Sequence, residues 1–194
     1  MNPESNQLEK AFLGKWTLVT SIAWLVGIIG SIIVAHIVNI IYPKETNLVV
    51  GLCVGAVVGY SQRFVLRKQI TVDGWWGLAC AIGLGVPFIV VVIFDEVGFK
   101  LPDLPSVQLL SRTIIGIIGG LLSGLFQLRL LKPYSTKAGW WILASSIGWG
   151  ICWLASSIAG PLVALVGLVI GGILLGVITG GCLLWILEFP VQEE

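Results

Sequence analysis

Six long apolar runs constrain the fold of this chain more than any other feature. They lie at 16–42, 47–66, 74–94, 109–131, 139–158 and 161–187. Residues that break helices mark the gaps between them, among them Pro43, Pro133 and Pro161. About 20 apolar residues form a helix that crosses the roughly 30 Å hydrocarbon core of a bilayer. The sequence therefore predicts an all-α integral membrane protein with six transmembrane helices.

The scarcity of charge agrees with this prediction. Charged residues make up 11% of the chain and hydrophobic residues 57%, whereas about 25% of an average soluble domain is charged. A net charge of +1 provides no concentrated basic face for nucleic acid. The four cysteines form no C-x-x-C pair, so the usual zinc and redox motifs are missing. We expect membrane lipids and other membrane protein subunits as partners, and no nucleic acid.

The basic residues predict the orientation of the chain. Three of the 11 Lys and Arg residues fall on the side away from the termini, at Lys44, Lys100 and Arg112. The other eight fall on the side of the termini: Lys10, Lys15, Arg63, Arg67, Lys68, Arg129, Lys132 and Lys137. Because basic loops stay in the cytoplasm, we expect both termini to be cytoplasmic.

Tryptophans mark the same boundary of the predicted membrane domain, which covers 16–187. Indole rings favour the headgroup level, so five tryptophans are expected to anchor the spans there: Trp16, Trp75, Trp76, Trp140 and Trp141. Residues 1–15 form a cytoplasmic segment that can lie as a short helix on the membrane surface. Residues 188–194 form an acidic cytoplasmic tail.

One apolar sequence pattern occurs three times in the chain. GWWILASSIGWG at 139–150 matches GWWGLACAIGLG at 74–85, and GKWTLVTSIAWLVG at 14–27 aligns with both. The span after each copy carries the pattern G-x-x-x-G-x-x-Q: Gly55-Gly59-Gln62, Gly120-Gly124-Gln127, and Gly172-Gly176 with Thr179 in place of Gln. Periods of this size indicate repeated supersecondary units. We therefore predict three tandem parallel helical hairpins, at about 14–68, 74–132 and 139–187, with a pseudo-threefold axis along the membrane normal.

Glycines at intervals of four residues predict how the spans pack. Residues four apart share a helix face, and glycine there allows a neighbouring backbone to approach closely. The pattern singles out nine helix-packing glycines: Gly51, Gly55, Gly59, Gly116, Gly120, Gly124, Gly172, Gly176 and Gly180. The simplest arrangement packs the second, fourth and sixth spans together near the axis and places the Trp-led spans outside.

Few polar side chains inside the spans are candidates for function. His36 can ligate a metal or the magnesium of a chlorin, respond to pH, or bond to a nearby carbonyl. Gln62, Gln127 and Thr179 recur at matched positions. They can coordinate a ligand, join helices by hydrogen bonds, or narrow an aqueous entrance. No nucleophile is paired with a base, and no cluster of metal ligands is present, so we expect neither an enzyme nor a metal site.

Three classes of function fit this pattern. We favour a non-catalytic accessory, assembly or structural component of a larger membrane complex, which requires no cofactor. A small channel or carrier with a path along the pseudo-threefold axis is the first alternative. A pigment- or lipid-binding membrane protein, with chlorophyll, carotenoid or lipid as ligand, is the second.

The chain also resembles the uncharacterised multi-pass proteins, familiar from cyanobacterial genomes, in which WW-led spans are followed by G-x-x-x-G-x-x-Q spans. The matching residues are Trp75-Trp76, Trp140-Trp141, Gly55 to Gln62 and Gly120 to Gln127. The third repeat departs from the pattern at Thr179 and in its acidic exit at Glu188. The resemblance implies the plasma or thylakoid membrane of a photosynthetic bacterium, and no particular activity.

Overall fold

The computed structural model describes residues 3–41, 46–98, 102, 104–157 and 161–191. Within these ranges the chain forms six α-helices and no strand. The helices are α1 (Pro3–Ile41), α2 (Thr46–Leu66), α3 (Trp75–Glu96), α4 (Pro105–Leu131), α5 (Trp140–Ser156) and α6 (Pro161–Leu187). The all-helical prediction is confirmed, and α2, α4 and α6 end where the predicted runs end.

The first helix is longer than the first apolar run. It begins at Pro3 and continues without a break to Ile41, over 39 residues. The segment expected at 1–15 is therefore, from Pro3 onward, the first part of α1 rather than a separate surface helix. Phe12 ties this part to the bundle, because its side chain is buried and its ring stacks on Trp16 with centroids 5.8 Å apart.

Five of the helices are long and apolar enough to cross a membrane: α1, α2, α3, α4 and α6. The remaining helix, α5, is apolar and has 17 residues. At a rise of 1.5 Å per residue it is about 25 Å long, slightly less than the thickness of a typical hydrocarbon core. The helix lengths are thus consistent with an integral membrane protein.

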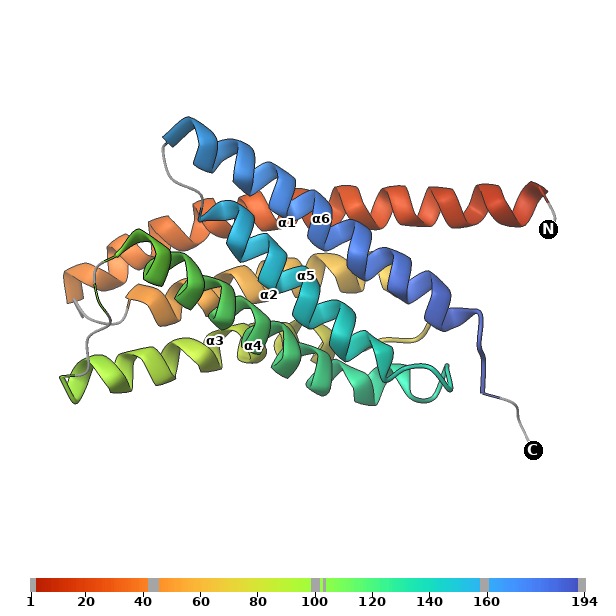
Figure 1. The fold of residues 1–194 in the computed structure, drawn as a ribbon. Coiled ribbons are helices and arrows are strands. Elements are labelled where there is room, and N and C mark those ends of the chain that lie inside the picture. The colour runs from red at the N-terminus through yellow and green to blue at the C-terminus, as the bar shows by residue number, and fades with distance from the viewer. Residues whose placement is uncertain (1–2, 42–45, 99–101, 103, 158–160, 192–194) are drawn as a thin grey trace.

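The helices form a closed ring. Each helix packs against its neighbours in the sequence, and α6 packs back against α1. In the described part of the chain, no other pair of helices makes backbone contact. Figure 1 shows that α1 begins and α6 ends at the same end of the bundle. The expectation that α2, α4 and α6 pack together at the centre is therefore wrong, because bulky side chains fill that space.

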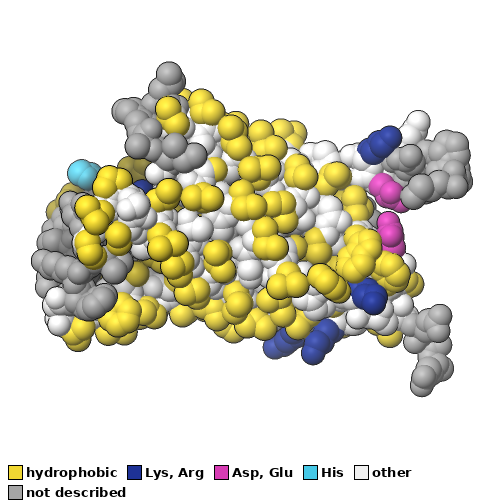
Figure 2. Space-filling model, in the orientation of Figure 1, with side chains coloured by type: hydrophobic (Ala, Val, Ile, Leu, Met, Phe, Trp, Pro, Cys, Tyr) yellow, Lys and Arg dark blue, Asp and Glu magenta, His cyan; other side chains and the backbone are white. Residues whose placement is uncertain are grey.

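The interior holds two clusters of buried side chains. One lies near the end where α1 begins and centres on Trp16, Trp76 and Trp141. The other lies deeper and centres on Trp24 and Trp149. Apolar side chains also cover the outside: exposed isoleucine, leucine and valine residues occur on all six helices (Figure 2). A chain that is apolar both inside and outside matches the composition expected for a bundle surrounded by lipid.

The glycine faces turn toward the next helix around the ring instead of toward one another. A Cβ atom on Gly55 would lie 2.5 Å from the carbonyl oxygen of Cys80 in α3, and one on Gly176 would lie 2.7 Å from Cα of Thr17 in α1. Gly120 approaches the backbone of α5 just as closely. All nine glycines of the pattern are buried: Gly51, Gly55, Gly59, Gly116, Gly120, Gly124, Gly172, Gly176 and Gly180. The missing side chains let α2 meet α3, α4 meet α5, and α6 meet α1 at backbone distance.

Candidate functional site

Three tryptophans fill the centre of the ring near the end where α1 begins. Trp16 comes from α1, Trp76 from α3 and Trp141 from α5, and each is at most 1% exposed. The ring centroids of Trp76 and Trp141 are 5.3 Å apart, and those of Trp16 and Trp141 are 6.4 Å apart. We call these three residues the tryptophan triad. Their packing joins three helices that make no backbone contact with one another.

Gln127 of α4 links two members of the triad. The indole Nε1–H of Trp141 donates to Oε1 of Gln127 at 2.9 Å, and Nε2 of Gln127 donates to the backbone oxygen of Trp76 at 3.2 Å. The Gln127 side chain is 2% exposed. One amide therefore ties α4 to both of its neighbours, α3 and α5.

Thr179 of α6 plays the matching part for the third tryptophan. Nε1–H of Trp16 donates to Oγ1 of Thr179 at 3.0 Å, and that hydroxyl donates to the backbone oxygen of Leu175 at 2.6 Å. The side chains of Trp16 and Thr179 are both buried. The contact joins α6 to α1, the two helices that are most distant in the sequence.

Gln62 of α2 does not repeat this arrangement. Its Nε2 atom donates to Oγ1 of Thr20 at 3.4 Å, a long contact between α2 and α1. Nε1 of Trp76, which the pattern would pair with Gln62, is buried and has no hydrogen-bond partner among the described residues. The triad thus has two bonded indoles and one unbonded indole.

The polar side chains at this end of the ring form hydrogen bonds that pack helices together. Gln62, Gln127 and Thr179 bond to other helices or to their own helix backbone. Among the described residues, no group of three or more His, Cys, Asp or Glu side chains could hold a metal ion. In an apolar bundle, hydrogen bonds of this kind hold helices together.

His36 lies far from the triad. Figure 2 shows the single histidine at the opposite end of the molecule from most of the visible Lys and Arg side chains. His36 is exposed and lines an open groove of about 560 Å³ between α1 and α2. The other lining residues are Ile32, Ile33, Ala35, Ile37, Asn39 and Val50. The structure therefore does not bring His36 together with Gln62, Gln127 or Thr179.

The tryptophans expected at the headgroup level separate into two groups. Trp16, Trp76 and Trp141 lie inside the ring and contact protein. Trp140 is 53% exposed, and Trp75 is partly exposed and donates through Nε1 to the backbone oxygen of Phe126 at 3.1 Å. An anchoring role in the headgroup layer stays a prediction for Trp75 and Trp140 only, because that role needs a surface position.

Further aromatic side chains, which the repeat pattern does not single out, gather beside Trp140 together with the basic Lys137. Trp185 packs edge-on between Trp140 and Phe189, with centroids 5.9 Å and 5.3 Å away. Lys137 lies 5.9 Å from the centroid of the Phe189 ring. Ser135 Oγ, between α4 and α5, lies 2.6 Å from the backbone oxygen of Ile186. The sequence signal for this cluster is the presence of Trp, Phe and Lys at or just beyond the ends of the last two apolar runs.

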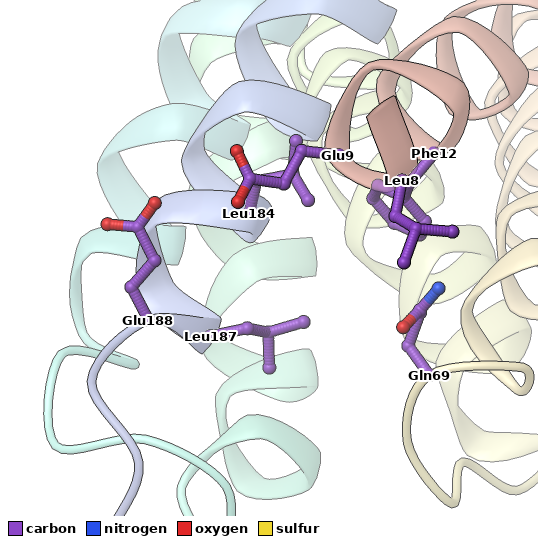
Figure 3. Close-up of a pocket in the computed structure, with 7 residues that line it drawn as sticks. All are labelled: Leu8, Glu9, Phe12, Gln69, Leu184, Leu187 and Glu188. Atoms are coloured by element: carbon purple, nitrogen blue, oxygen red, sulfur yellow. The ribbon is translucent and has the colours of Figure 1, made fainter. Parts of the chain in front are cut away.

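A second groove opens at the same end, between the first turns of α1 and the end of α6. It has a volume of about 220 Å³ and is lined by Leu8, Glu9, Phe12, Gln69, Leu184, Leu187 and Glu188. In Figure 3, Leu8, Leu187 and Gln69 point into the space between the helices, whereas the carboxylate of Glu188 points away from it. The groove therefore does not present a pair of converging carboxylates.

Comparison with known proteins gives no family for this arrangement. No protein-family model, no curated protein and no solved structure matches the chain.

Proposed function

We propose that this chain is a non-catalytic integral membrane protein that acts as an accessory, assembly or structural component of a larger membrane complex. The observation that carries the proposal is the use of the polar side chains inside the ring. Gln127 and Thr179 are buried, and their hydrogen bonds go to neighbouring helices. The outer surface offers exposed apolar side chains on every helix, which lipid or other membrane subunits can cover.

The proposed topology has six spans with both termini in the cytoplasm. The short helix α5 is included because it packs between α4 and α6, and a span slightly shorter than the bilayer core is accommodated by local thinning. The orientation is supported by the distribution of charge. In Figure 2, most visible Lys and Arg side chains lie in the half of the molecule toward the end where α1 begins.

We further propose that α1–α2, α3–α4 and α5–α6 are three copies of one hairpin. Support comes from three glycines, each facing the residue that stands five positions after a member of the triad. A Cβ atom on the glycine would lie 2.7 Å from Cα in the pair Gly55–Ala81, 2.8 Å in Gly120–Ser146 and 3.1 Å in Gly172–Ser21. Equivalent positions in the sequence thus make equivalent contacts, as a pseudo-threefold arrangement requires.

Isolation from the native host tests the accessory role. The chain is tagged at its C-terminus, extracted with a mild detergent and separated on a native gel, and mass spectrometry identifies the proteins that migrate with it. A second membrane protein with the same tag serves as the control. Migration in a large species with companions that the control lacks is the expected result. Migration as a small species without companions would contradict the proposal.

The channel or carrier alternative has less support from the interior. The triad occupies the centre of the ring, where an axial path would run. Solute flux in proteoliposomes distinguishes the two functions. If the wild type conducts a solute and the double variant Gln62→Leu, Gln127→Leu alters that flux, the channel function replaces the accessory function.

His36 favours pigment binding as a second candidate function. An exposed imidazole beside a groove lined mostly by isoleucine and valine combines a ligating nitrogen with an apolar wall. Such a site suits a flat apolar pigment, and the resemblance to cyanobacterial proteins points to a plasma or thylakoid membrane that contains pigments. Visible absorbance of the protein purified from its host tests this function. Bound pigment that is lost in His36→Ala would support it, and a colourless wild type would exclude it.

A further inference from the structure

Three cations gather on the face of the ring where α1 and α2 meet near the termini. The ammonium group of Lys68 is close enough to that of Lys15 for the two positive charges to repel each other. The guanidinium carbon of Arg67 lies 4.4 Å from the centroid of the Phe64 ring, and Lys68 Nζ lies 6.0 Å from the same centroid. The three cations are exposed. We call Lys15, Phe64, Arg67 and Lys68 the α1–α2 basic cluster.

No carboxylate in the part of the chain that the structure describes neutralises this cluster. Among the described residues, Lys15, Arg67 and Lys68 make no ion pair with a carboxylate. Two neighbouring ammonium groups repel each other, and an anion placed between them turns that repulsion into attraction. The face therefore offers several donors to an external group with several acceptor oxygens.

The other basic positions at this end are less concentrated. Arg129 lies 5.9 Å from the centroid of the Trp75 ring, and Lys137 lies 5.9 Å from that of Phe189. Among the described residues, each of these aromatic rings has one cation beside it, whereas Phe64 has two and Lys15 adds a third charge next to Lys68. The α1–α2 basic cluster thus has the highest density of positive charge among these faces.

Apolar side chains continue from the cluster toward the middle of the bundle. On α1, Leu18 and Ile22 follow Lys15 at helical spacing and are 61% and 51% exposed. A ligand that combines a negative headgroup with apolar chains fits such a surface, whereas a free anion would leave the apolar part uncovered.

We infer that the α1–α2 basic cluster binds the phosphate of an anionic phospholipid whose acyl chains lie along Leu18 and Ile22 of α1. The inference rests on the proposed location of this face at the membrane surface. It adds a defined lipid site to the non-catalytic role, with Lys15 and Lys68 as the residues that contact the phosphate.

Native mass spectrometry of the full chain in non-ionic detergent micelles tests this site. The protein is titrated with phosphatidylglycerol and, separately, with phosphatidylcholine, and the fraction carrying one lipid is measured. Tighter binding of phosphatidylglycerol is expected. The double variant Lys15→Gln, Lys68→Gln should weaken it about tenfold or more, since each near-surface cation adds to the attraction for an anionic lipid. Equal affinity of this variant and the wild type would overturn the inference.

The double variant Arg129→Gln, Lys137→Gln is the matched control, because it removes the same charge from the same end of the ring. It should keep phosphatidylglycerol affinity within about twofold of the wild type, because neither side chain belongs to the α1–α2 basic cluster. A loss as large as that of the lysine variant would show diffuse attraction and overturn the inference. Excess inorganic phosphate should leave the lipid bound, and displacement would show a free-anion site instead. Lipid binding in micelles is measured independently of the proteins that migrate with the chain on the native gel. Failure of the lipid site can therefore be distinguished from failure of the proposed accessory role.

Discussion

The indole Nε1–H of Trp141 donates to Oε1 of Gln127 at 2.9 Å, while Nε2 of the same amide donates to the backbone oxygen of Trp76 at 3.2 Å. The two bonds join α5, α4 and α3 through one buried side chain. A buried amide with both ends paired stabilises the bundle, whereas removing it leaves the indole N–H of Trp141 without a partner. The consequences of this relationship can be measured.

Replacing Gln127 with leucine should destabilise the bundle. The variant leaves Trp141 Nε1 unpaired in an apolar interior, at a cost of about 1–3 kcal/mol. The midpoint of thermal unfolding in detergent micelles, followed by tryptophan fluorescence, measures the loss. Gln69→Leu is the control, because Gln69 is exposed. Equal midpoints for Gln127→Leu and the wild type would contradict a packing role for Gln127.

Two tryptophan substitutions should differ in their effects. Trp141→Phe removes a bonded indole N–H, whereas Trp76→Phe removes one that has no partner among the described residues. Both changes also shrink the side chain, so the difference between them isolates the hydrogen bond. We expect Trp141→Phe to lower the free energy of unfolding by about 1 kcal/mol more than Trp76→Phe. The opposite order in a denaturant titration would count against the arrangement of hydrogen bonds around the triad.

The close approach of α4 to α5 makes Gly120 intolerant of any side chain. A Cβ atom there would collide with the carbonyl oxygen of Ser145, so Gly120→Ala should cost about 1–3 kcal/mol through overpacking. Gly181→Ala is the matched control, because a Cβ atom on Gly181 would have nothing within 4 Å. Accumulation in the membrane and the unfolding midpoint report the outcome. Similar yield and stability for both variants would disagree with the close contact between α4 and α5.

Ser135 holds the chain that leaves α6 against the turn between α4 and α5. Its Oγ atom lies 2.6 Å and 2.9 Å from the backbone oxygens of Ile186 and Phe189, and it accepts from the Lys137 amide at 3.1 Å. Ser135→Ala should speed hydrogen exchange at the end of α6 while leaving the middle of the helix protected. Ser157→Ala is the control, since that hydroxyl bonds within its own turn, to the oxygen of Trp153. Unchanged exchange at the end of α6 in Ser135→Ala would refute this role.

The sequence predicts helices well because apolar length is a local property. Five predicted runs recur as helices with similar bounds, and the first differs only because α1 extends back to Pro3. The helical periodicity also identifies which face of α2, α4 and α6 carries the glycines. It does not reveal which helix that face meets, because the choice of partner depends on how the whole ring closes. The expected contact among these three helices failed for that reason.

The site could be predicted only in part. Gln127 and Thr179 were singled out by position, and the structure pairs them with Trp141 and Trp16. The burial of those tryptophans was not evident, since a tryptophan at a span boundary fits both the headgroup layer and the core. The doublet Trp140-Trp141 explains the ambiguity: adjacent helical residues point in different directions, so one ring faces out while the other faces in.

A disulfide between α1 and α6 tests the closed ring most directly. A Cβ atom on Gly172 would lie 3.5 Å from Cβ of Ser21, within the usual span of a disulfide. Ser21→Cys with Gly172→Cys, in a background lacking the four native cysteines, should give an intramolecular cross-link under mild oxidation. The pair Ser21→Cys with Ile173→Cys is the control, since Ile173 is 42% exposed and faces away from the interior. A cross-link confined to the Gly172 pair is the predicted result. Failure of that pair together with cross-linking of the control would contradict the closed ring.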